Sequence, residues 1–86
     1  MVAHSEARRE EVAYRRLQRE AERIASLIVA SDYAAVDVVI AIRQLKEFVE
    51  AEFPGTRRLF EMVYEGRFKR LWEQFREQRD GALPEW

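Results

Sequence analysis

The feature that most constrains the fold of this chain is an apolar stretch, Ile24–Ile42, which reads IASLIVASDYAAVDVVIAI. Asp32 and Asp37 are the charged residues within it, whereas the segments on both sides are densely charged. The stretch has a borderline length for a membrane helix, but two aspartates near its middle would each cost about 2.5–3.5 kcal/mol on insertion. We therefore expect no membrane segment, and we expect the flanking segments to bury this stretch.

The chain has 86 residues, which is enough for a single domain, residues 1–86. A domain of this size has a small core and often gains stability from a disulfide, a metal or a partner chain. The sequence contains no cysteine, and its single histidine, His4, lies near the N-terminus, so neither a disulfide nor a zinc site is expected. Association with a partner chain remains, and we expect a homodimer or a complex with another protein.

The charge pattern bears on location and on partners. The N-terminal sequence MVAHSEARREE has no apolar run behind a basic start, so it does not read as a secretory signal, and the cytoplasm is the expected location. Charged residues make up 36% of the chain, but the net charge is −1. Such a balance provides no long-range attraction for nucleic acid or for an anionic membrane, and we expect neither as the partner.

The spacing of the apolar residues predicts an all-α protein. The first helix is expected over residues 5–30, with Ser5 as its N-cap, because apolar residues recur there at steps of three and four. The polar pair Ser31-Asp32 predicts a break, after which a second helix covers residues 32–53 with Asp32 as its N-cap and Asp37 in its first turn. These segments predict two antiparallel helices.

The sequence Phe53-Pro54-Gly55-Thr56 predicts a turn, with Thr56 as the N-cap of a third helix over residues 56–79. Gly66 lies in the middle of this helix, where we expect close packing against a neighbouring helix. The tail, residues 80–86, is too short for an element. The residues expected on the inward face of the third helix are Phe60, Tyr64, Phe68, Leu71 and Phe75.

The sequence leaves one alternative fold open. The three–four spacing continues through Ser31-Asp32, so a single helix from Ser5 to Phe53 could pair with the third segment as a long-helix α-hairpin. The three segments have well-matched lengths, however, and uncapped helices far longer than 25 residues are uncommon outside coiled coils. We therefore favour a small antiparallel three-helix bundle that dimerises through helix faces.

The sequence contains no set of residues that would predict catalysis. With no cysteine and one histidine, it lacks a nucleophile with its base, and it has no glycine-rich phosphate loop or Glu-x-x-His pair. We predict no catalytic residue, no metal, no cofactor and no small-molecule substrate. One alternative is that Asp32 or Asp37 is a buried carboxylate with a raised pKa.

The remaining signal is spare apolar surface. Several apolar residues lie outside the main helical stripes, and soluble monomers rarely leave such residues clustered and uncovered. We interpret the chain as a non-catalytic protein–protein interaction or regulatory module. The alternative is a nucleic-acid-binding regulator that uses the third helix, where basic and aromatic residues interleave. The residues predicted to form the partner surface are Leu27, Val29, Tyr33, Val36, Ile40 and Trp72.

Overall fold

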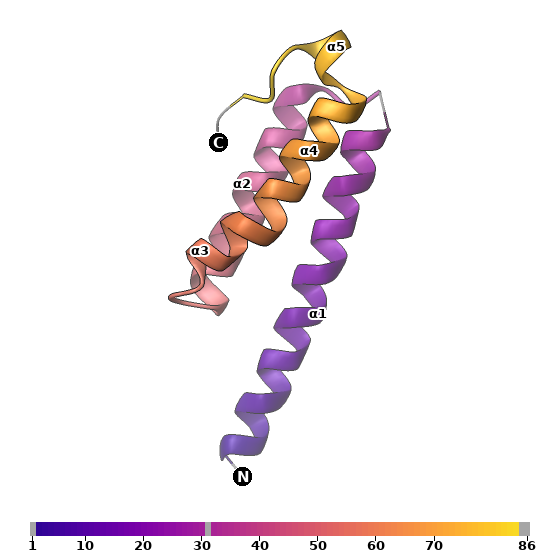
Figure 1. Ribbon diagram of the computed structural model, residues 1–86. Helices are drawn as coiled ribbons and strands as arrows, with labels where there is room; N and C mark the ends of the chain where they lie inside the picture. Colours follow the sequence, from indigo (N-terminus) through magenta and orange to yellow (C-terminus); the bar gives the residue numbers. More distant parts are fainter. Residues whose placement is uncertain (1, 31, 85–86) are drawn as a thin grey trace.

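The computed structural model describes residues 2–30 and 32–84, and every regular element in this part of the chain is helical. The elements are α1 (Val2–Val29), α2 (Ala35–Glu52), α3 (Arg57–Phe60), the π-helical turn η1 (Glu61–Glu65), α4 (Gly66–Phe75) and α5 (Glu77–Asp80). Helices α3, η1 and α4 follow one another without a break and form one helical segment, which we call the third segment. The absence of strands from the described residues confirms the predicted all-helical class. Figure 1 shows that α2 runs antiparallel to both α1 and the third segment.

Helix α1 is the longest element, and it determines the shape of the molecule. It begins at Val2, so Ser5 lies inside the helix and is not its N-cap. At 1.5 Å per residue α1 is about 42 Å long and α2 about 27 Å, and the N-terminal end of α1 extends beyond the turn between α2 and α3 (Figure 1). The long axis of the molecule therefore reaches 53 Å, against 21 and 17 Å for the other two.

The chain reverses between Val29 and Ala35, which excludes the long-helix hairpin. Ser31 lies outside the described residues. Asp32 is exposed in the connection, and the N-cap position of α2 is Ala34 without a side-chain capping bond, so the prediction that Asp32 caps α2 is wrong. Asp37 lies in the first turn of α2 as predicted; it is also exposed, which excludes a buried carboxylate at either aspartate.

The turn between α2 and α3 forms where the sequence predicted it. Gly55 has a φ of 85°, which a residue with a side chain rarely adopts. Thr56 occupies the N-cap position of α3, but its side chain makes no capping bond. Its hydroxyl instead donates to the carbonyl oxygen of Phe53 at 2.6 Å, which closes the turn.

The third segment faces the core through four of the five predicted residues, since Phe60 and Phe68 are buried and Tyr64 and Leu71 pack against the core, but Trp72 takes the place predicted for Phe75. Phe60, Phe68 and Trp72 are buried, whereas Phe75 is 47% exposed. In an uninterrupted α-helix, Phe60 would point about 120° away from Trp72, at 100° per residue. The wider turn of η1 absorbs one extra residue and returns Phe60 to the core side. Phe75, the last residue of α4, is left facing solvent.

The core lies where α1, α2 and the third segment meet. The apolar stretch that dominates the sequence supplies much of it, with Ile24, Ile28, Val38 and Ile42 all fully buried. The expected close packing of a neighbouring helix at Gly66 is not present. A Cβ built there would meet only the side chain of Arg70 and the backbone of Glu61, both on the same segment. None of the described helices is both long enough and apolar enough to cross a membrane.

Candidate functional site

The structure places one of the six predicted partner-surface residues inside the protein. Trp72 has no exposed surface, and its indole N–H donates to the carbonyl oxygen of Gly81 at 2.8 Å. The prediction placed Trp72 at the edge of the third helix because it assumed an uninterrupted α-helical period. With η1 present, Phe68 and Trp72 form the inward row of α4, so Trp72 cannot line a partner surface in this fold.

The other five predicted residues remain accessible to different degrees. Leu27 is partly buried and packs against the core. Val36 and Ile40 are 61% and 48% exposed, and they lie four residues apart on the side of α2 opposite its buried residues. Val29, at the end of α1, and Tyr33, in the connection, are also exposed. None of these residues lines any of the three hollows described below, so their role in binding stays a prediction.

Arg76 is the buried charged residue of the described chain, with 1% of its surface exposed. It follows α4 directly, where φ of −125° ends the helix. Its guanidinium donates to the carbonyl oxygens of Leu27, Ile28 and Ala30, each at 2.7 Å, and to that of Tyr33 at 2.6 Å. The last carbonyls of a helix have no partner within that helix, so Arg76 caps α1 from across the bundle.

The charge of Arg76 is balanced and shielded locally. Asp80 accepts a hydrogen bond from Arg76 at 3.2 Å and one from Arg79 at 2.9 Å. These two guanidinium groups, Arg79 first, hold the pKa of the Asp80 carboxyl below its usual range. The Arg76 guanidinium also lies 5.2 Å from the ring centre of Trp72. This cluster joins the end of α1 to the end of α4 and has a structural role.

An apolar groove opens between α1 and the first half of the third segment. It has a volume of about 240 Å³, and all nine residues that line it are uncharged. Figure 1 shows α1 diverging from α3 at this level. Three of the lining residues are large and at least half exposed: Tyr14 at 50%, Leu59 at 62% and Val63 at 50%. The lining residues are Tyr14, Leu17, Val49, Phe53, Thr56, Leu59, Phe60, Val63 and Tyr64.

An ion pair joins the two walls above the groove. Arg67 of α4 donates to Glu22 of α1 at 2.7 Å. This hydrogen bond, with the attraction of the guanidinium, lowers the pKa of the Glu22 carboxyl. Burial raises the pKa of the Tyr64 phenol, so the group remains an uncharged part of the groove lining up to high pH. The groove therefore has an apolar floor and one end marked by a fixed ion pair.

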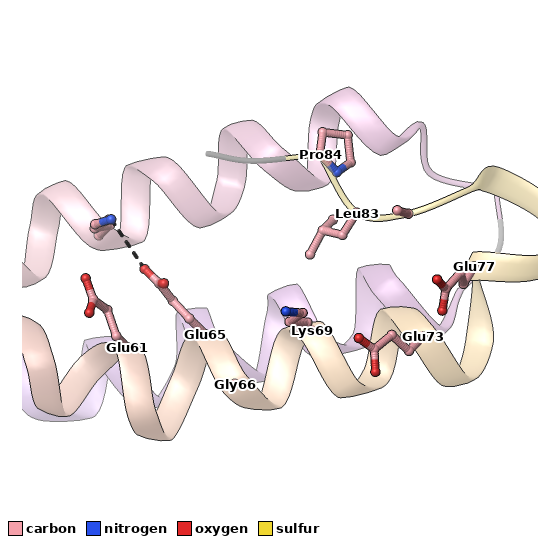
Figure 2. A pocket seen from close by; sticks show the side chains of 10 residues that line it. Glu61, Glu65, Gly66, Lys69, Glu73, Glu77, Leu83 and Pro84 are labelled. Carbon is pink, nitrogen blue, oxygen red and sulfur yellow. Dashed lines mark ion pairs between the residues drawn. The ribbon is translucent and has the colours of Figure 1, made fainter.

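A second, polar cavity lies between α2, α4 and the C-terminal tail (Figure 2). It has a volume of about 630 Å³. Leu83 reaches from the tail toward the space between the two helices and packs against the core. Lys46 of α2 lies 3.6 Å from Glu65, the one ion pair drawn in Figure 2. The remaining charged residues of the lining are Glu61, Lys69, Glu73 and Glu77.

The polar cavity holds charges of both signs but no obvious reactive set. Its charged residues are four glutamates and two lysines. Within residues 2–30 and 32–84, no group of three or more histidine, cysteine, aspartate or glutamate residues could hold a metal ion. Oε1 of Glu65 is buried and accepts no hydrogen bond from the described residues, so Lys46 is the charge that offsets it.

A third hollow lies on the opposite flank of α1 from the groove. Its volume is about 430 Å³, and Arg8, Arg9 and Arg16 line it together with Phe48 and Glu52 of α2. The guanidinium of Arg16 lies 4.5 Å from the centre of the Phe48 ring, a geometry at which cation–π attraction is expected. This contact covers one face of the only aromatic ring in that lining.

Sequence reasoning did not find Arg76 or the groove. One signal for Arg76 was available: it lies four residues after Trp72, on the row of the third segment that faces inward. The end of α1 also lacks a glycine that would cap it, which indicates that another group satisfies its carbonyls. No comparable signal marked the groove, because Tyr14 and Leu59 are far apart in the sequence.

No family model matches this chain, and neither the curated proteins nor the solved structures include a significant match.

Proposed function

We propose that this chain is a non-catalytic protein–protein interaction or regulatory module that binds its partner through the apolar groove. The observation that carries the proposal is the exposure of Tyr14, Leu59 and Val63 around one uncharged hollow. Clustered apolar surface on a soluble domain is typical of an interaction site. A concave site lined by aliphatic and aromatic side chains also suits the apolar face of another protein.

The charges of the fold support a non-catalytic role. The charged side chain that lies in the core of the described chain is Arg76, and its guanidinium is engaged by backbone carbonyls and Asp80. The carboxyls whose pKa is lowered, Glu22 and Asp80, are paired with arginines and do not line the three hollows described above. Neither arrangement supplies the pair of a base and a nucleophile that acyl or phosphoryl transfer would need.

The nucleic-acid alternative draws little support from the third segment, in which Phe75 is the one exposed aromatic side chain among the described residues. Phe60, Phe68 and Trp72 are buried and cannot stack on bases. Glutamates also lie among the arginines of this segment, with Glu61 paired to Arg57 at 3.2 Å. The net charge of −1 points the same way.

Site-specific photocrosslinking in the native cells tests the proposal. A photoreactive amino acid at Leu59 lies at the groove, and the same residue at Val36, on the outer side of α2, is a control of nearly equal exposure, 62% against 61%. We expect a discrete protein adduct from position 59 and a much weaker one from position 36. Adducts with nucleic acid at position 59, or no protein adduct there, would refute the proposal.

A further inference from the structure

The occupant of the groove is indicated by the charges on its two edges. On α1, Glu10 and Glu11 lie one turn before Tyr14, so the α1 edge is acidic at this level, although Arg15 pairs with Glu11 at 2.7 Å. On the third segment, Arg58 precedes Leu59, and no ion pair of Arg58 occurs within the described residues. The groove therefore has an acidic edge and a basic edge on either side of an apolar floor.

These two edges lie at the same level along the molecule. The Glu22–Arg67 contact places the two residues side by side, and α1 runs in the same direction as the third segment, although it diverges from α3 (Figure 1). Tyr14 lies eight residues before Glu22 on α1, and Arg58 lies nine residues before Arg67 on the third segment. The two distances along the helix axes are similar, because the π turn in the third segment has a smaller rise per residue. Arg58 is thus opposite Tyr14 and its neighbours rather than above or below them.

The two edges of the groove have the charges needed to pair with the edges of a second copy of the chain. In a dimer whose twofold axis runs parallel to the groove, residues at the same height in the two copies lie opposite each other. The α1 edge of one copy then lies opposite the third-segment edge of the other. The acidic edge of one copy then faces the basic edge of the other, twice in each dimer. A twofold axis across the groove would instead oppose like edges, so the charges select parallel α1 helices.

The edge of the groove also provides a side chain that can enter it. Met62 of η1 is 70% exposed, the highest value among the large apolar residues whose side chains the structure describes, and it lies one turn from both Arg58 and Leu59. Methionine is flexible and fills irregular apolar hollows well. The exchange of edges places Met62 of each copy over the groove of the other.

The size of the molecule sets an upper limit on the area that a second copy could cover. The long and short extents of the molecule, 53 and 17 Å, give one side a projected area of roughly 900 Å², which is close to the surface that each partner buries in a standard interface. We infer that a second copy of this chain covers the groove, as a twofold dimer with parallel α1 helices in which Met62 enters the opposite groove and Arg58 faces Glu10 and Glu11. This inference rests on the proposed function and names its partner.

Sedimentation equilibrium of the full chain tests the inference, with circular dichroism to confirm that each variant is folded. We expect the wild-type protein at tens of micromolar to have a mass near twice 10.3 kDa. Met62→Glu should raise the dimer dissociation constant at least tenfold, whereas Ile40→Glu, on the outer side of α2, should leave it unchanged. A monomeric wild-type protein, or the opposite ranking of the two variants, would overturn the inference.

A charge exchange tests the orientation. Arg58→Glu alone and the double variant Glu10→Lys/Glu11→Lys alone should each weaken the dimer, because each opposes like charges twice. An equimolar mixture of the two should recover a heterodimer of near wild-type affinity, since every opposed pair is then of opposite sign. Two weakened variants without recovery would exclude parallel helices. If the protein is monomeric and a photoreactive residue at position 59 still forms an adduct with a different protein, the inference that a second copy binds the groove is wrong. The proposed function would then still stand.

Discussion

Replacement of the buried Arg76 by methionine should destabilise the fold more than replacement of any other single charged residue in the described chain. Methionine keeps an unbranched apolar side chain and removes the guanidinium, so the carbonyls of Leu27, Ile28, Ala30 and Tyr33 lose their donor. A hydrogen bond to a charged group contributes about 1.5–3 kcal/mol, and these bonds share one group and are not additive.

The net loss combines two opposing terms. Four bonds at the lower value would sum to about 6 kcal/mol, but removal of a buried cation also recovers part of its desolvation penalty, and water can reach the exposed connection after Val29. We therefore expect a loss of about 3 kcal/mol. A chain of 86 residues has a total stability of about 4–13 kcal/mol, so the variant should keep between about one quarter and three quarters of it.

Urea unfolding followed by circular dichroism at 222 nm measures this loss. With a slope of about 1–1.5 kcal/mol/M for a small domain, the midpoint should fall by roughly 2–3 M. Protein concentration is held fixed, because dimer formation would add to the apparent stability. Arg43→Met is the control: Arg43 is exposed on α2, and the described residues provide it with no ion pair, so its midpoint should not move. Equal midpoints for the two variants would refute the capping role of Arg76.

Three further predictions concern the core, the connection and acid stability. Ile42→Ala should cost about 2–5 kcal/mol because Ile42 is fully buried, whereas Ile40→Ala should cost less than about 0.5 kcal/mol; equal losses in urea unfolding would contradict the core assignment. Asp32→Ala should leave the unfolding midpoint unchanged, since Asp32 caps no helix, and a loss near 1 kcal/mol would restore it as a cap. The lowered pKa of Glu22 means that its pairing with Arg67 stabilises the fold at pH values above its ordinary pKa of 4.5 and that this contribution disappears as the pH falls through the lowered value. The stability difference between wild type and Glu22→Gln, measured by thermal melts, should therefore shrink on acidification from about pH 6 to about pH 2.5, and a constant difference would contradict the assignment.

The sequence by itself determined the helical class and the principal boundaries. The burial of Ile24–Ile42 followed from its lack of charge, because an apolar stretch in water must be covered. The turn at Phe53-Pro54-Gly55-Thr56 followed from the backbone preferences of proline and glycine, which depend on the residue and not on its neighbours in space. Ser31-Asp32 marked the right place for the reversal for a related reason, although Asp32 does not act as the cap.

The face that each helix presents was decided by the tertiary structure. Trp72 and Phe75 exchange roles relative to the prediction, since η1 shifts the helical phase so that Phe60, Phe68 and Trp72 are buried together. A π turn is less favourable than an α-helical turn, and here the packing between distant segments offsets its cost. The residues of the turn itself therefore carry no clear signal for it in the sequence. A period read from the sequence alone therefore assigns the wrong residues to the surface.

The capping of α1 and the groove also depend on contacts between distant residues. Arg76 bonds to carbonyls 43–49 residues before it, and a charged residue near a helix end is expected in solvent unless such partners are known. Tyr14, Leu59 and Val63 line one groove only because α1 and the third segment belong to the same bundle. Hydrophobic spacing reports which residues share one helix face, and the packing of the helices decides which of those faces is covered and which remains open for a partner.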